Sequence, residues 1–255
     1  MPTPASNATF PYVLRLGDSA LVLSQRLSAL CGKGPALEED MALANTALDL
    51  LGQARLWLSY AGELEAKGRD EDALAFFRTD RQFHNLLLVE QPNGNYADTM
   101  VRQFFFDAWH NLALTELTRS ADPRIAEIAA KGEREARYHL RRSADLLVRL
   151  GDGTSLSHSY TQIAVDRLWP FTGEVFAADT VDTELAAAGI GFRPDALEAP
   201  WLDYLTKVFS TATLTLPAAN LWMQKGGKQG IHTEHLGYLL AEMQAVPRSF
   251  PGAKW

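Results

Sequence analysis

The stretch that most constrains the fold runs from Met41 to Gly62, because it is apolar on more than one side. Its sequence, MALANTALDLLGQARLWLSYAG, is rich in Ala and Leu, contains no proline and is charged only at Asp49 and Arg55. Such a composition favours a helix, and a helix that is apolar on two faces is expected to be covered on both. We therefore expect the central helix of a helical bundle. The first face comprises Leu37, Met41, Ala44, Leu48, Leu51 and Leu58, and the second comprises Leu43, Ala47, Leu50, Ala54, Trp57 and Ala61.

Polar residues within this stretch argue against a membrane span. Asn45, Gln53 and the two charged residues fall in the middle of the run, where hydrocarbon would surround them. The N-terminus, MPTPASNATF, lacks the basic and apolar regions of a signal peptide. The one cysteine, Cys31, gives no disulfide framework and indicates a reducing compartment. We expect a cytoplasmic protein that contacts no membrane.

The composition is that of an ordinary globular protein. The chain has 255 residues, of which 47% are hydrophobic and 22% charged, so it can bury a core without a disulfide or metal staple. The net charge of -7 argues against a nucleic-acid groove. We expect a single helical domain over residues 1–255, with a flexible arm at 1–11 and a C-terminal tail at 245–255.

Helical periodicity continues on both sides of the central helix. Glycine and proline clusters separate the helical stretches, and Pro170 should kink one of them. Segment 179–200 is less regular, and 201–216 suits a helix in its first half and an extended segment or strand in its Thr-rich second half. Long antiparallel helices joined by short turns predict an all-α bundle. The expected helices span about 13–31, 36–66, 70–90, 97–119, 122–150, 156–177 and 232–244.

A bundle of this kind suggests a ferritin-like di-iron site, which needs a carboxylate from each of two helices and Glu-x-x-His from each of two others. No Glu in this chain precedes a His by three positions, and among Asp residues only Asp107 does, in DAWH. The central helix offers Leu50-x-x-Gln53, and the residue three before His139 is Ala136. A dinuclear site therefore lacks too many ligands.

Asp107, His110 and His139 still need an explanation. We favour polar residues in the core that bond to each other or to neighbours, because an unpartnered buried charge is too costly to persist. We expect Asp107 to accept at least one side-chain hydrogen bond, from His139, His110 or an Arg of an adjacent helix. A mononuclear metal is the alternative. His232-Thr-Glu-His235 more readily marks the first turn of a helix at an interface than a metal site.

Basic and amide residues crowd the short segment from Arg78 to Asn85. A solvated face explains such a cluster, and contact with an anionic or amide-rich ligand is the functional alternative.

Six blocks of the sequence are long or specific enough for comparison: LRLGDSALVLSQRL (14–27), ALANTALDLLGQAR (42–55), LLLVEQPNGNYADT (86–99), DAWH (107–110), EARYHLRRS (135–143) and GGKQGIHTEHLG (226–237). Together they resemble one family, the C subunits of the bacterial ring-1,2-phenylacetyl-CoA epoxidases. The resemblance covers about residues 12–255 and implies a ferritin-like fold with a degenerate metal site. It implies a non-catalytic structural subunit of a multicomponent monooxygenase that supports the di-iron catalytic A subunit in aerobic phenylacetate degradation. A small B subunit and a reductase would be further partners.

The same resemblance places the ligand positions of the catalytic relative on residues of this chain. It implies no cofactor in this chain, and it places the CoA ester of the substrate, phenylacetyl-CoA, near two segments. The competing hypothesis is an independent ferritin-like metal-dependent oxidase or hydroxylase with an atypical site. The ligand positions fall on Leu50, Gln53, Asp107, Ala136 and His139, and the residues near CoA are Arg81, Gln82, Phe83, His84, Asn85, Thr183, Glu184 and Leu185.

Overall fold

Helices make up all the regular structure that the computed structural model describes, which covers residues 4–218 and 221–253. No strand occurs in these ranges, so the prediction of an all-α protein is confirmed. None of the described helices is long and apolar enough to cross a membrane. The chain divides into two compact units, Met1–Pro92 with Gly226–Trp255, and Asn93–Lys225. The predicted single domain stays a prediction.

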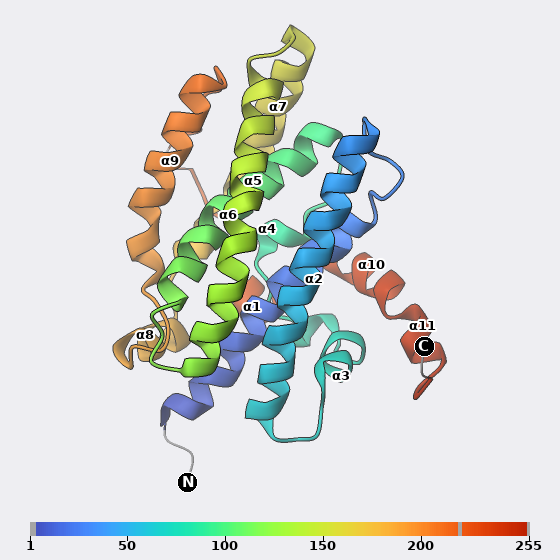
Figure 1. The fold of residues 1–255 in the computed structure, drawn as a ribbon, viewed down its shortest axis with the longest axis vertical. Helices are drawn as coiled ribbons and strands as arrows, with labels where there is room; N and C mark the ends of the chain where they lie inside the picture. The colour runs from blue at the N-terminus through green and yellow to red at the C-terminus, as the bar shows by residue number, and fades with distance from the viewer. Residues whose placement is uncertain (1–3, 219–220, 254–255) are drawn as a thin grey trace. The chain divides into compact units, whose positions relative to one another are not determined.

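Unit 1 is built on two long helices that lie side by side in opposite directions, α1 (Pro4–Ser28) and α2 (Leu37–Glu65) (Figure 1). Three acidic residues open α2, where a carboxylate interacts favourably with the helix dipole. One of them, Asp40, also accepts hydrogen bonds from the backbone N–H groups of Gly32 and Gly34 and so fixes the turn between the two helices. The shorter elements of this unit are α3 (Glu71–Phe76), η1 (Asp80–Gln82), α4 (Leu87–Glu90), η5 (Gly227–Gln229), α10 (Glu234–Met243) and α11 (Ala245–Ser249).

Helix α2 buries only one of its two apolar faces. The face containing Leu43, Leu50 and Trp57 is buried. The other face is largely exposed, so the prediction that both faces are covered is wrong for this chain. Within unit 1, α2 packs mainly against α1 and α3, and these two helices leave the face with Leu37, Met41, Leu48 and Leu51 uncovered. On that face Leu37 is 71% exposed, Met41 57%, Leu48 65% and Leu51 41%.

Unit 2 is organised around α5 (Tyr96–Leu117), which is buried along most of its length. Every residue from Ala97 to His110 is buried. Within the unit, α5 packs along α6 and against α7 and α9. Its aromatic residues build the core, where the Phe105 ring lies 5.8 Å from Trp169 and 5.9 Å from Trp201. The other elements are α6 (Pro123–Gly151), α7 (Ser155–Leu168), η2 (Trp169–Phe171), η3 (Gly173–Phe176), α8 (Thr180–Ala187), η4 (Pro194–Leu197) and α9 (Glu198–Thr211).

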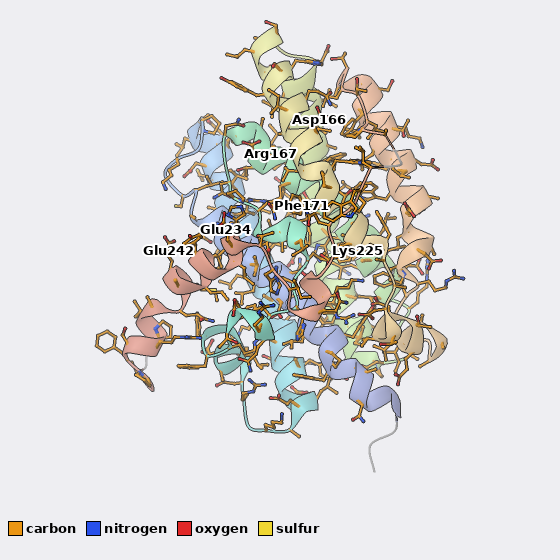
Figure 2. The ribbon with its side chains drawn as sticks, turned by 180° about the vertical axis from the view of Figure 1, so that it is seen from behind. Asp166, Arg167, Phe171, Lys225, Glu234 and Glu242 are labelled. Atoms are coloured by element: carbon orange, nitrogen blue, oxygen red, sulfur yellow. The ribbon has the colours of Figure 1, made fainter. Side chains whose placement is uncertain are left out.

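Side-chain bonds fix the start of α5. Asn95 and Asp98 form a capping box, in which each side chain accepts from the other's backbone N–H. The buried Asp98 carboxylate also forms an ion pair of 2.5 Å with Arg167 of α7, which is labelled in Figure 2. The same carboxylate thus caps α5 and ties α7 to its first turn.

The two segments predicted as a flexible arm and a C-terminal tail both contain helix. The described chain is already helical at Pro4, and Ala8 and Thr9 are buried, so a loose arm over 4–11 is wrong. Packing of these side chains outweighs the unfavourable local propensity of Pro11. The predicted tail includes α11, while residues 1–3 and 254–255 lie outside the described part.

Three predicted internal segments are also shorter or more regular than expected. Instead of one helix over 70–90, α3, η1 and α4 form separate pieces, because side-chain caps at Asp70 and Thr79 restart the chain. The helix predicted over 156–177 ends at Leu168, and Pro170 lies in the 3₁₀ turn that follows, so it does not kink the helix. Segment 201–216 is helical to Thr211, and no strand follows it in the described residues.

Candidate functional site

Asp107 of α5 is fully buried and accepts a hydrogen bond of 2.7 Å from Gln103 Nε2. The prediction that Asp107 accepts a side-chain hydrogen bond is therefore confirmed. The donor is not one of the expected residues but an amide one turn earlier on the same helix. The second carboxylate oxygen, Oδ2, has no hydrogen-bond partner within the described chain.

Burial controls the protonation of this region of unit 2. Loss of solvent raises the pKa of Asp107 to about 6, while His139 and the Ser143 hydroxyl on α6 oppose the rise. Burial, together with a smaller effect of the neighbouring His139, lowers the pKa of His110 to about 3. His110 is therefore a neutral ring in the core, packed 4.8 Å from the Phe106 ring.

The positions that resemblance assigns to metal ligands do not fit a di-iron group. In unit 1, Leu50 is fully buried and has no donor atom, and Gln53 is a buried amide. In unit 2, Ala136 is fully buried and also has no donor atom, although Asp107 and His139 keep ligand-type side chains. No group of three or more His, Cys, Asp or Glu side chains that could hold a metal occurs in residues 4–218 and 221–253.

A buried ion pair organises the segment around residues 81–85. The Arg78 guanidinium forms two bonds to Asp18, of which Nη1 to Oδ2 is 3.0 Å, and both side chains are almost fully buried. The cation lies 4.1 Å from the centre of the Phe83 ring. The same Asp18 oxygen accepts the backbone N–H of His84 at 2.8 Å. This segment is thus fastened to α1 by a charge pair that a motif search from sequence has no means of detecting.

A second buried carboxylate, Glu90, holds the C-terminal segment of unit 1. It accepts from Asn85 Nδ2 at 3.0 Å, and Glu90 Oε2 lies 2.8 Å from His232 Nδ1. Its other oxygen accepts the backbone N–H and the hydroxyl of Thr233 at 2.6 and 2.7 Å. His232, the first His of the HTEH motif, lies just before α10 and therefore bonds the Glu90 carboxylate at the end of α4.

These contacts separate the predicted CoA-binding residues of unit 1 into buried structural residues and exposed ones. Phe83 and Asn85 are buried and serve the internal network. Gln82 Oε1 accepts the backbone N–H of Thr79 at 2.8 Å. His84 is half-buried, and burial lowers its pKa. Arg81 is exposed, and its guanidinium forms no ion pair within the described chain.

The second predicted CoA-binding segment lies on α8 of unit 2. Leu185 is fully buried, while Thr183 and Glu184 are exposed. Thr183 lines a surface pocket of about 650 Å³ together with Arg193 and Asp195. The ion pair between these two residues raises the pKa of Arg193 and lowers the pKa of Asp195. The pocket thus presents a guanidinium and a hydroxyl next to the apolar side chains of α8.

An all-helical, ferritin-like fold with apolar side chains at ligand positions defines a class of bundle proteins that lack a complete di-iron ligand set. The chain belongs to the phenylacetic acid catabolic protein family, whose family model matches residues 1–255. It is 54% identical over 249 residues to the C subunit of the 1,2-phenylacetyl-CoA epoxidase of Escherichia coli (strain K12). The match covers 98% of this chain and 100% of that relative. The resemblance seen in the sequence blocks is confirmed.

Proposed function

We propose that this chain is a non-catalytic structural subunit of a cytoplasmic phenylacetyl-CoA epoxidase, in the aerobic degradation of phenylacetate. In this proposal a homologous catalytic subunit holds the di-iron centre, and this chain holds no cofactor. A small B subunit and a reductase complete the system. The observation that carries the proposal is the exposed apolar row on α2, formed by Leu37, Met41, Leu48 and Leu51.

The α2 row has the properties of a protein interface. At 100° per residue its members fall on one side of the helix, and Leu37 and Leu51 are about 21 Å apart along the axis. Single exposed apolar residues are common, but a continuous row marks a binding surface. Large apolar interfaces are typical of obligate complexes. The occupant we propose is the catalytic subunit, since the relative in Escherichia coli is itself named as a subunit.

The ligand positions support a non-catalytic role. Leu50 and Ala136 can neither bind a metal nor transfer a proton, and both side chains are fully buried. The alternative, an independent metal-dependent oxidase, would need a ligand set that these side chains do not supply.

Contact with the CoA ester is the finer part of the proposal. Arg81 offers an exposed cation in unit 1, and Thr183 lines a pocket with Arg193 in unit 2. A CoA ester carries phosphates, which a guanidinium binds strongly. We propose, for each unit by itself, that the exposed residues contact a CoA ester: Arg81 in unit 1, positioned by the buried Phe83 and Asn85, and Thr183 in unit 2, positioned by the buried Leu185.

Coexpression with the catalytic subunit tests the proposal. The wild-type chain should elute with the catalytic subunit as one complex, and Leu48→Glu with Leu51→Glu should abolish it. Leu156→Glu, at an α7 residue that is 61% exposed, is the matched control and should leave assembly intact.

The chain purified alone should contain no stoichiometric iron. About two irons per chain, with oxygenase activity and no partner, would establish the alternative instead.

A further inference from the structure

The exposed face of α6 carries a row of cations. Lys131, Arg134 and Arg141 are exposed, and at 100° per residue they fall on one side of the helix. Tyr138, which is 52% exposed, lies between them on the same side. We call these residues the basic row. Lys131 and Arg141 are about 15 Å apart along the helix axis.

The cations of the basic row have no carboxylate partners. None of the three forms an ion pair with another residue in the described part of the chain. Their basic neighbour Arg137, by contrast, is paired with Glu133 one turn away. The acidic residues just beyond the two ends of the row also form ion pairs, Glu127 with Arg124 and Asp145 with Arg149.

Unpaired like charges on adjacent turns repel one another and destabilise a helix. The chain as a whole has a net charge of -7, so a local excess of cations on one exposed face departs from its general balance. A surface of this kind gains from an anionic partner that supplies the missing countercharges.

We propose that the basic row is a docking surface for an acidic helix of another subunit of the epoxidase, an inference that rests on the proposed function. The partner in this proposal is a protein subunit, so the anions that it offers are Asp and Glu side chains, which guanidinium groups bind through paired hydrogen bonds. Arg141 lies 5.7 Å from the centre of the Tyr138 ring, and Tyr and Arg are both enriched in protein interfaces. The spacing of the row over three turns matches carboxylates on successive turns of a facing helix.

This surface differs in chemistry from the α2 row. The α2 row is apolar, so its complex should persist at high salt, whereas contacts through exposed charges weaken as salt screens them. The basic row should therefore bind a component that joins the complex reversibly and in a salt-dependent way.

The test compares two triple variants of equal charge change in the complex reconstituted from all epoxidase subunits. The first is Lys131→Glu with Arg134→Glu and Arg141→Glu. The matched control reverses three exposed lysines elsewhere, Lys33→Glu with Lys207→Glu and Lys225→Glu. Binding of each remaining subunit is measured between low and high ionic strength. For one subunit, we expect the first variant to weaken binding roughly tenfold or more at low salt and to flatten the salt dependence.

The outcomes separate this inference from the proposed function. If the wild-type chain binds no epoxidase subunit, both are wrong. If the wild-type chain assembles and the basic-row variant assembles equally well, or if the control weakens binding as much, only the docking inference is wrong. Binding of the wild-type chain to an RNA probe as tightly as to any subunit, and its loss in the basic-row variant, would assign the row to nucleic acid and overturn the proposal.

A zero-length carbodiimide cross-link provides a second readout, because it joins a lysine amine only to a carboxylate in direct contact. In the assembled complex, Lys131 should be joined to an Asp or Glu of another subunit. Absence of any such product from intact complex, while other intersubunit cross-links form, would count against the docking surface.

Discussion

Gln103 donates a hydrogen bond of 2.7 Å to Asp107 Oδ1 from one turn earlier on the same helix, in the buried interior of unit 2. A neutral amide thus partners a carboxylate at a position where resemblance implies a metal ligand in the catalytic relative. The bond is local to α5, so it forms with the helix itself.

Replacement of Asp107 should therefore affect stability. Asp107→Ala leaves the Gln103 amide buried and unpaired, which costs about 1–3 kcal/mol of unfolding free energy. Asp107→Asn keeps the shape and an acceptor, so it should cost less. Urea denaturation of the two variants measures both values. Turnover per assembled complex should stay near the wild-type rate, and a normally folded Asp107→Ala complex without turnover would show that Asp107 is catalytic.

The raised pKa of Asp107 predicts how this variant changes the pH dependence of stability. The folded state holds this proton up to about pH 6, whereas the unfolded chain releases it near 3.8. The folded form therefore binds more protons between these values, and Asp107 makes stability fall as pH rises, by up to about 1.4 kcal/mol per pH unit. Asp107→Asn removes this contribution. Its stability relative to wild type should increase from pH 4 to 6, and a difference that stays constant over this range would contradict the raised pKa.

His110 should act in the opposite direction. Burial lowers its pKa from 6.5 to about 3, so the unfolded chain binds a proton that the folded chain excludes. Stability from this residue is present above pH 6.5 and is lost as pH falls toward 3, again by up to about 1.4 kcal/mol per unit. His110→Gln should flatten the acid limb of the stability curve. Thermal unfolding from pH 4 to 7 would show this, with Asp107→Asn as the comparison in which the acid limb becomes steeper.

We expect the stability of the C-terminal segment of unit 1, including α10, to depend on Glu90. Its carboxylate is fully buried and bonds Asn85, His232 and Thr233. Glu90→Ala strands these donors, and breaking such a network costs about 3–5 kcal/mol. Hydrogen exchange should accelerate first in α10. The control is Glu234→Ala, at an exposed residue in the first turn of α10 labelled in Figure 2, which loses only its interaction with the helix dipole and should change exchange rates far less.

The sequence predicted the long helices well, because their periodicity is local information. It did not predict which helix is enclosed. Two apolar faces on residues 37–61 indicated burial of both, yet the face with Met41 and Leu48 is exposed and α5 is the buried helix. An apolar face packs equally well against the same chain or against a partner, so hydrophobic periodicity alone does not distinguish them.

In the candidate site too, local motifs could be predicted from the sequence, whereas contacts between distant residues could not. The missing ligands at Leu50 and Ala136 could be counted from spacing, because Glu-x-x-His is a local motif. The ion pairs Asp18–Arg78 and Glu90–His232 join residues far apart in the sequence, and no sequence motif predicts them. The predicted cluster from Arg78 to Asn85 therefore mixes a buried structural cation with exposed side chains that only the structure separates.

This separation gives a sharp test of CoA contact, which rests on the proposed function. Arg81 is exposed and forms no ion pair within the described chain, and Thr183 lines a pocket, so Arg81→Ala and Thr183→Val should leave folding and assembly intact. Loss of a charge-assisted contact to phosphate is worth about 1.5–3 kcal/mol, so Arg81→Ala should raise the KM of the complex for phenylacetyl-CoA roughly tenfold or more with kcat nearly unchanged. Asn85→Ala should instead lower stability, because it removes a buried donor to Glu90. Steady-state kinetics of intact complexes, beside a melting curve for each variant, decide the matter. Unchanged kinetics in both exposed variants would show that Arg81 and Thr183 are solvated surface residues that do not contact CoA.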